Sequence, residues 1–179
     1  MAVPARIALV GYRGSGKTTL GRLLARRLDY PFVDTDLVVE QRQGVSIATI
    51  FANEGESAFR RYEAEVLSEE LRQDRLVLAT GGGVVISPKN RQRLKSAAFV
   101  IWLDPPVATL TRRVAADPRT IDRRPSLTGA SAASEIESVL RQRRPWYQEV
   151  ARLRIDTSHG SPETHVEEIV RAWAPEGLP

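Results

Sequence analysis

The sequence predicts an α/β fold in which helices cover both faces of a parallel sheet. Two observations carry this prediction: short apolar runs alternate with segments of helical spacing, and the first run leads directly into a glycine-rich loop. Strands that alternate with helices pair in parallel, because each helix carries the chain back across the sheet. The length of 179 residues fits one domain, so we expect residues 1–179 to fold as a single unit.

The strands are predicted where apolar residues run together between turn-forming residues. The fourth run, for example, is continuously apolar and ends at Asp104-Pro-Pro106. Runs of this kind are typical of strands that are buried on both faces of a parallel sheet. The predicted strands are residues 6–10, 30–33, 76–79, 98–103 and 153–155.

Helices are predicted between the strands, where apolar residues recur every three or four positions. The second helix stops at Gly44, and the last one places Val166, Ile169 and Trp173 at core spacing. The predicted helices are residues 17–28, 36–43, 46–54, 56–71, 88–95, 106–115, 134–149 and 162–173.

Residues 117–131 differ from the rest of the chain because they are rich in Pro, Arg, Asp and Gly and poor in apolar residues. Loops of this length in compact domains are usually functional or disordered. We therefore predict a mobile lid over about residues 114–130; the alternative is an ordinary surface loop. The tail, residues 174–179, is expected to fray.

Residues 11–18 read Gly-Tyr-Arg-Gly-Ser-Gly-Lys-Thr, a complete phosphate-binding loop (P-loop) of the form G-x-x-x-x-G-K-[ST]. Its glycines allow positive φ and let backbone N–H groups surround a polyphosphate. Because the loop lies between a strand and a helix N-terminus, the helix dipole also favours phosphate. This context argues against a chance glycine-rich turn and predicts a nucleotide site at Gly14, Ser15, Gly16, Lys17, Thr18 and Thr19. Lys17 would reach the β- and γ-phosphates, and the Thr18 hydroxyl would bind Mg²⁺.

Composition and charge exclude several other classes of protein. The chain is 42% hydrophobic and 27% charged, as soluble globular domains are. Its net charge is +4, and all but three of its 26 basic residues are arginines, whose planar fork suits carboxylate and phosphate. These arginines are scattered among acids, so an anionic small substrate is favoured over nucleic acid.

The chain also lacks signals for export or membrane insertion. No apolar run approaches the length that spans a bilayer, and the N-terminus has no signal-peptide pattern. The absence of cysteine excludes disulfides and thiolate metal sites. We expect no membrane partner and a cytoplasmic location.

Asp34-Thr-Asp36 follows the second predicted strand, at the sheet edge where open α/β sheets bind ligands. One carboxylate could hold Mg²⁺ through water, and the other could orient or deprotonate an acceptor hydroxyl. The alternative is that one of them caps the next helix.

Three downstream segments extend this candidate acceptor side. Arg60 and Glu63 are three residues apart and face each other on a helix, either as a supported substrate clamp or as a surface ion pair. Thr80-Gly-Gly-Gly83 leaves the backbone bare for ligand contacts, or forms a plain tight turn. Arg143 lies in a basic stretch that by itself suits a helix C-terminus.

Together these segments resemble the shikimate kinase family, which are P-loop kinases of the nucleoside-monophosphate-kinase-like fold. The resemblance covers nearly the whole chain, from residue 7 to about residue 173. The pairing of Phe59-Arg60-x-x-Glu63 with Thr80-Gly-Gly-Gly83, after Asp34-x-Asp36, is far more specific than the phosphate loop. The other matching segments are Ile50-Phe51, Gly55-Glu56, Val84-Val85, Arg124-Pro125, Arg143-x-Pro145-x-Tyr147 and Ile155-Asp-Thr157.

The resemblance implies a three-layer α/β/α P-loop fold with a central five-stranded parallel sheet, a small substrate-binding helical region at about residues 35–63, and the mobile lid. It implies a monomer that phosphorylates the 3-hydroxyl of shikimate, with ATP and Mg²⁺ as cofactors. Thr18 would be the direct metal ligand, with Asp34 beside the metal. Arg124, on the lid, would close over the transferring phosphate alongside Lys17. Arg113, with the loop from residue 157 to 162, would flank the adenine.

On the acceptor side, the resemblance implies that Asp36 binds the shikimate hydroxyls and acts on the attacking one. Arg60 and Arg143 would clamp the shikimate carboxylate, and Glu63 would support Arg60. Gly81, Gly82 and Gly83 would line the ring of the substrate.

The chain departs from the family pattern at Ser126, Gln142 and Trp146, where Leu, Glu and Leu are usual. None of these departures removes a proposed catalytic group. Three other functions stay open: a gluconate kinase, a nucleotide-binding regulatory domain without turnover, and a nucleic-acid-associated NTPase. The intact Lys17, Asp36 and Arg124 favour an enzyme over a regulatory domain.

Overall fold

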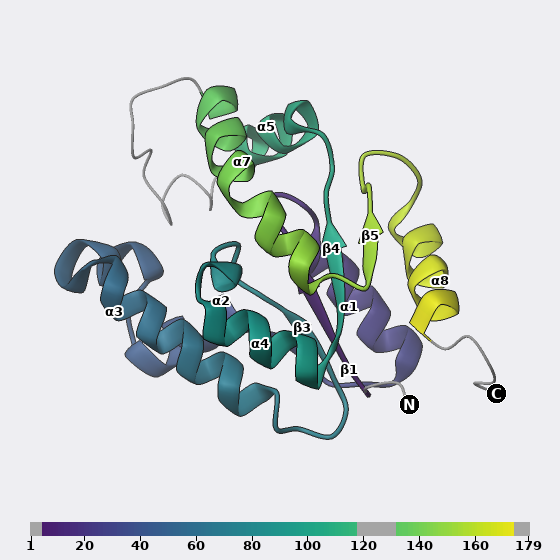
Figure 1. Ribbon diagram of the computed structural model, residues 1–179, viewed down its shortest axis with the longest axis horizontal. Coiled ribbons are helices and arrows are strands. Elements are labelled where there is room, and N and C mark those ends of the chain that lie inside the picture. Colours follow the sequence, from purple (N-terminus) through teal and green to yellow (C-terminus); the bar gives the residue numbers. More distant parts are fainter. Residues whose placement is uncertain (1–4, 118–131, 174–179) are drawn as a thin grey trace.

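The computed structural model describes residues 5–117 and 132–173 and contains a parallel sheet with the strand order β2-β3-β1-β4-β5 (Figure 1). The strands are β1 (Arg6–Val10), β2 (Phe32–Asp34), β3 (Leu76–Ala79), β4 (Phe99–Leu103) and β5 (Leu153–Ile155). The helices are α1 (Lys17–Leu28), α2 (Thr35–Gln43), α3 (Ile47–Glu70), α4 (Pro88–Ala97), α5 (Val107–Ala116), α7 (Ala132–Val150) and α8 (Pro162–Trp173). The predicted fold class is confirmed.

The three central strands are buried along almost their whole length, as their unbroken apolar runs predict. The edge strand β2 starts two residues later than predicted. The backbone N–H of Tyr30 donates to the carbonyl of Ala25 at 2.9 Å, so this residue still belongs to the end of α1. The carbonyl of Pro31 then accepts from Val77 N at 2.9 Å, and this bond leads into the ladder between β2 and β3.

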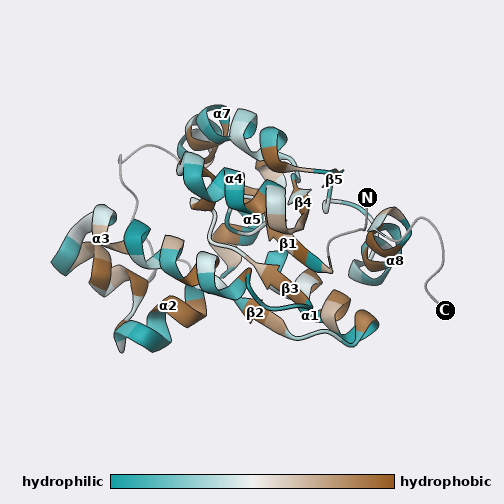
Figure 2. Ribbon diagram, turned by 60° about the horizontal axis from the view of Figure 1, so that its bottom comes forward, coloured by the Kyte–Doolittle hydropathy of each residue, from teal (hydrophilic) through white to brown (hydrophobic). Residues whose placement is uncertain are grey.

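Two apolar layers cover the two faces of the sheet. On one face, residues of α4 and α7 pack on β1, β3 and β4, with the rings of Trp102 and Tyr147 stacked at 5.8 Å. On the other face, α1 and α8 pack on the same strands. A third, smaller cluster lies between α2 and α3, which project from the side of the sheet away from α8 in both views (Figures 1 and 2). Figure 2 shows that the hydrophobic sides of the helices turn inward.

Gly55 interrupts α3 with φ 82° and ψ 172°, so that two helical segments meet there. The two helices predicted at 46–54 and 56–71 therefore correspond to the two arms of α3. The short 3₁₀ helix η1 (Val84–Ile86) follows the glycine run and was not predicted.

The predicted lid lies outside the described residues from residue 118 onward, and so does the tail at 174–179. Arg124 and Ser126 fall in this part of the lid. Within 5–117 and 132–173, no helix combines the length and the apolar character needed to cross a membrane.

Candidate active site

The phosphate-binding loop connects the end of β1 to the first residue of α1. Gly11, Gly14 and Gly16 have φ of 142°, 76° and 99°, which side chains rarely allow. A Cβ on Gly11 would also lie 2.5 Å from the carbonyl oxygen of Leu103 in β4. Gly16 is the N-cap of α1 and supplies no side-chain cap, so the first N–H groups of the helix are available to an anion.

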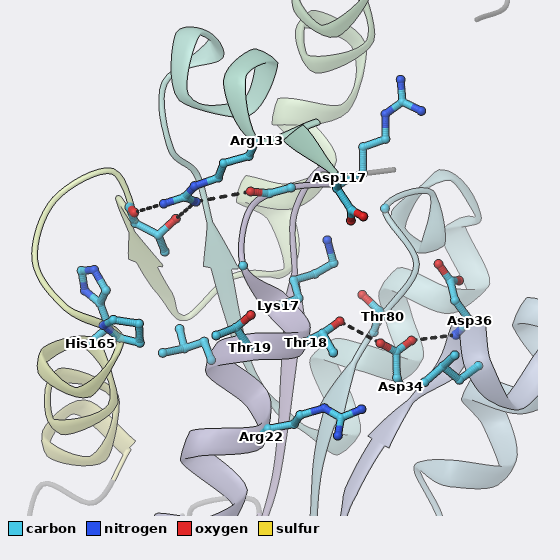
Figure 3. Close-up of a pocket in the computed structure, with 18 of the residues that line it drawn as sticks. Lys17, Thr18, Thr19, Arg22, Asp34, Asp36, Thr80, Arg113, Asp117 and His165 are labelled. Carbon is cyan, nitrogen blue, oxygen red and sulfur yellow. Dashed lines mark hydrogen bonds between the residues drawn. The ribbon is translucent and has the colours of Figure 1, made fainter. Parts of the chain in front are cut away.

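Lys17 folds back along this loop. Its Nζ donates to the carbonyl oxygens of Gly11 and Tyr12, both at 2.8 Å, and to Ser15 Oγ at 3.4 Å. The ammonium group thus lies over the concave side of the loop, where Figure 3 shows it pointing into the cavity. This position fits the predicted contact with the β- and γ-phosphates.

The two carboxylate oxygens of Asp34 have different partners. Its Oδ1 accepts from Asp36 N at 3.2 Å and caps α2, while its Oδ2 accepts from Thr18 Oγ1 at 2.8 Å. Among the described residues, no cluster of three His, Cys, Asp or Glu side chains could hold a metal. A hydroxyl beside one carboxylate fits Mg²⁺, which typically uses one or two carboxylates and completes its shell with water and substrate phosphates.

A cavity of about 630 Å³ opens beside the loop and is large enough for a small ligand. Figure 3 shows its residues converging from the start of α1, the ends of β2 and β3, the end of α5 and the start of α8. It is lined by Arg13, Gly14, Gly16, Lys17, Thr18, Thr19, Leu20, Arg22, Asp34, Asp36, Leu37, Ile47, Thr80, Gly82, Arg113, Asp117, Thr157, Gly160, Pro162 and His165.

Arg113 joins the phosphate-binding loop to the loop after β5. Its guanidinium donates to Gly14 O at 3.3 Å, and to Thr157 Oγ1 and O at 3.0 and 2.6 Å. Thr157 Oγ1 in turn donates to Ser15 O at 2.9 Å. These bonds build one wall of the cavity at the place where the sequence predicts the adenine.

Arg60 lies between two carboxylates. Its Nη1 donates to Oε2 of Glu63 at 2.7 Å, and its Nε and Nη2 donate to Oε1 of Glu56 at 3.2 and 3.0 Å. Burial is the largest influence on the pKa of Arg60 and lowers it, but the two glutamates together outweigh burial and raise this pKa above its ordinary value. Since the Glu63 side chain is only 1% exposed, this is not the surface ion pair of the alternative interpretation.

The glycine run makes room for these side chains. A Cβ on Gly81 would lie 2.5 Å from Glu63 Oε1 and 2.6 Å from Asp36 Oδ1. A Cβ on Gly83 would lie 2.3 to 2.5 Å from the guanidinium of Arg60. The bare backbone thus brings Asp36, Glu63 and Arg60, from two different helices, around one segment.

Gly82 connects this segment to α7 and to the phosphate-binding loop. Its carbonyl accepts hydrogen bonds from Arg143 Nη1 at 3.1 Å and from the hydroxyl of Tyr147. On its other side, a Cβ on Gly82 would lie 3.4 Å from Gly11 O and 3.5 Å from Arg13 N. The predicted nucleotide and acceptor residues therefore meet at Gly82.

The structure brings together all the predicted site residues that it describes, and Arg124 alone lies outside the described part of the chain. Sequence reasoning missed Arg13, Asp117 and His165 in the cavity wall. Arg13 occupies a position where the loop motif accepts any residue, so the motif gave no signal. His165 is one of only two histidines, which could have drawn attention to it.

Comparison with known proteins agrees with this geometry. A family model described as shikimate kinase matches residues 13–174. The shikimate kinase of Symbiobacterium thermophilum is 47% identical, over 92% of this chain and 93% of the relative. The chain belongs to the shikimate kinase family. The solved structure of shikimate kinase from Acinetobacter baumannii in complex with shikimate is 38% identical, with a TM-score of 0.87 over 95% of this chain and 92% of that chain.

A gluconate kinase, the alternative that the sequence left open, has a similar fold. A gluconokinase from Sinorhizobium meliloti has a TM-score of 0.60 over 98% of this chain and 94% of that chain, but it is only 17% identical. That likeness shows the fold alone. Membership of the shikimate kinase family makes this chain a kinase that phosphorylates shikimate with ATP, in aromatic amino-acid biosynthesis.

Proposed function

We propose that this chain transfers the γ-phosphoryl group of MgATP to the 3-hydroxyl of shikimate, giving shikimate 3-phosphate and ADP. The observation that carries the proposal is the meeting of two sets of groups at Gly82. The phosphate-binding loop lies on one side of this residue, and Arg143 binds its carbonyl on the other. A phosphate donor and an anionic acceptor bound to these groups would be neighbours.

The nucleotide side positions the transferring group. The N–H groups of the loop and of the first turn of α1 bind the phosphates, and Lys17 adds a positive charge near the β- and γ-phosphates. Thr18 and Asp34 would hold Mg²⁺, which would supply positive charge to neutralise the phosphates. Arg113 and the loop from 157 to 162 enclose the base.

The acceptor side fixes the orientation of shikimate. Arg60 and Arg143 bind the carboxylate, and the buried Glu63 keeps the Arg60 guanidinium in place. Asp36 accepts the proton of the attacking hydroxyl. Its carboxylate lies against Gly81, which supports this role because Gly81 is proposed to line the ring of the substrate. Phosphoryl transfer needs mostly such positioning and positive charge, because the transition state spreads negative charge over the phosphoryl oxygens.

We extend the proposal to the organisation, oligomeric state and location of the enzyme. Residues 1–179 form a single kinase domain, with a substrate-binding region at about 35–63 and a lid at about 114–130. Arg124 contributes to the transfer on the strength of the family motif alone. The enzyme acts as a monomer in the cytoplasm, without a nucleic-acid or membrane partner.

The test is an assay of ADP release with MgATP and shikimate, gluconate or no acceptor. We expect turnover only with shikimate, at about 1 to 100 per second as in typical kinases, and a product phosphorylated at the 3-hydroxyl by NMR. Turnover only with gluconate would overturn the assignment of shikimate as the acceptor. Tight ATP binding without acceptor-dependent release of ADP would favour the regulatory-domain alternative. In a separate assay, binding of nucleic acid that weakens as the salt concentration rises would reveal a nucleic-acid partner.

A further inference from the structure

The guanidinium of Arg60 has one side held by a buried carboxylate and one side held by an exposed one. Nη1 donates to Glu63 at 2.7 Å, whereas Nε and Nη2 both donate to a single oxygen, Oε1 of Glu56. Nε and Nη2 form one of the two-pronged edges with which arginine binds a planar carboxylate. Glu56 therefore occupies a complete carboxylate-binding edge of Arg60.

The two glutamates differ sharply in exposure. The side chain of Glu63 is 1% exposed, and that of Glu56 is 55% exposed. Breaking a buried ion pair leaves an uncompensated buried charge, which is strongly unfavourable. An exposed pair contributes little, because water replaces the lost partner. Glu63 is thus the permanent partner of Arg60, and Glu56 is the partner that can exchange.

The exposure of Glu56 gives its side chain room to leave. Glu56 directly follows Gly55, where the two arms of α3 meet, and its side chain is more than half exposed to solvent. The Glu56 carboxylate is joined to the rest of the described chain only through Arg60 among the hydrogen bonds and ion pairs of the structure. Moving it away breaks no packing of the core.

We propose that Glu56 occupies the carboxylate-binding edge of Arg60 and competes with the carboxylate of the acceptor, so that Glu56 sets the affinity of the enzyme for that substrate. The inference rests on the proposed function, in which Arg60 binds this carboxylate. Two carboxylates cannot share one edge of a guanidinium without repulsion, so the acceptor displaces Glu56 into solvent. Glu56 is a positioning residue and touches no reacting atom.

The competition gives Glu56 an effect opposite to that of Glu63. Removing the charge of Glu63 would release Arg60 and weaken acceptor binding. Removing the charge of Glu56 leaves Arg60 held by Glu63 and frees the edge that the acceptor needs. The acceptor then binds more tightly, and an acceptor without a carboxylate gains nothing.

The experiment compares Glu56→Gln with the wild-type enzyme, using shikimate and its methyl ester, which lacks the negative charge. Glu54→Gln is the matched control, because Glu54 is also exposed beside Gly55 but accepts its hydrogen bond from Tyr62 at 2.9 Å instead of from Arg60. Steady-state ADP release gives kcat and KM, and calorimetry gives the Kd of each acceptor.

We expect Glu56→Gln to lower the KM and Kd for shikimate roughly two- to fivefold, the range of an exposed ion pair. The kcat, the constants for the methyl ester, and all constants of Glu54→Gln should remain as in the wild type. A higher or unchanged KM and Kd for shikimate would overturn the proposal and make Glu56 a support of Arg60. Equal shifts for shikimate and its ester would also overturn it. Failure of the proposed function is distinguishable, because the wild-type enzyme itself would then show no turnover with shikimate.

Discussion

Replacing Gly83 with alanine should displace the acceptor clamp without disturbing the nucleotide site. The new Cβ would lie 2.3 to 2.5 Å from three atoms of the Arg60 guanidinium. Ordinary contacts between such atoms are about 3.5 Å, so the guanidinium has to move by roughly 1 Å. The 2.7 Å bond to the buried Glu63 opposes this movement. Because a misplacement of about 1 Å can cost roughly 100-fold, we expect kcat/KM for shikimate to fall about 10- to 100-fold.

The assay is ADP release with shikimate varied at saturating MgATP, together with a melting curve. Gly83 has φ −102°, which alanine adopts without left-handed backbone strain, so any fall in the melting temperature reports the displaced pair of Arg60 and Glu63. The same substitution in an Arg60→Ala background isolates the mechanism, since alanine at position 83 then meets no guanidinium and should cost nothing further. An undiminished kcat/KM, or an equal loss in both backgrounds, would refute the reasoning that Gly83 acts through Arg60.

Three further substitutions test other parts of the site. Asp36→Asn should lower kcat about 10²- to 10⁴-fold by removing the proton acceptor, while an altered KM for MgATP would show that Asp36 serves the nucleotide instead. Arg113→Ala should raise the KM for MgATP about tenfold, because hydrogen bonds from a charged group to Gly14 and Thr157 are lost. A change confined to the KM for shikimate would contradict the position of Arg113 in the wall of the nucleotide site. Tyr147→Phe keeps the ring but removes the hydroxyl that donates to the carbonyl of Gly82. Urea denaturation should therefore show a free energy of unfolding that is lower by about 1 kcal/mol. An unchanged free energy of unfolding would mean that this hydrogen bond contributes nothing to stability.

The sheet could be predicted from the sequence because its strands carry a simple signal. β3 and β4 are buried from end to end and β1 is buried after its first residue, so their apolar runs are almost unbroken. The order of the strands could not be predicted, because an apolar run does not record which neighbour it pairs with. The start of β2 could not be predicted accurately, because all three of its residues are only partly buried and give a weak apolar signal. The strand begins two residues later than predicted, after the hydrogen bond from Tyr30 to the end of α1.

Asp34 shows why the sequence left two interpretations open. A helix cap and a metal-binding carboxylate use the same atoms and the same position after a strand. In the structure Oδ1 accepts from Asp36 N and caps α2, whereas Oδ2 accepts from Thr18 Oγ1 of the phosphate-binding loop. The direction of this second oxygen depends on the fold, so the local sequence does not record it.

The acceptor side was predictable in its residues but not in its packing. The spacing of Arg60 and Glu63 predicted that they would face each other, yet spacing carries no information on burial, and burial decides that Glu63 holds Arg60. Tyr147 gave no functional signal beyond the family motif, because an aromatic residue at helical spacing is normally interpreted as a residue of the hydrophobic core. Its hydroxyl becomes visible as a site element only when Gly82 is placed beside it.

Trp146 is the departure from the family pattern that the structure explains. Its ring lies 5.5 Å from the guanidinium of Arg91 in α4, a favourable arrangement of a cation over an aromatic face. Arg91 donates to the carbonyl oxygens of Val85 and Ile86 at 2.8 and 3.1 Å, and to Glu149 of α7 at 2.7 Å. Gln142, by contrast, makes no contact in the structure that explains its choice.

Trp146 is connected through Arg91 to the carbonyls of Val85 and Ile86, which follow the glycine run. Arg143 donates to the carbonyl of Gly82 in that run, so α7 is joined to this part of the chain both directly and through Arg91. The ring at position 146 adds a contact with Arg91 to the ion pair that Glu149 makes with the same guanidinium. Trp146 therefore strengthens the link between α7 and α4, and Arg91 carries that link to the carbonyls of Val85 and Ile86.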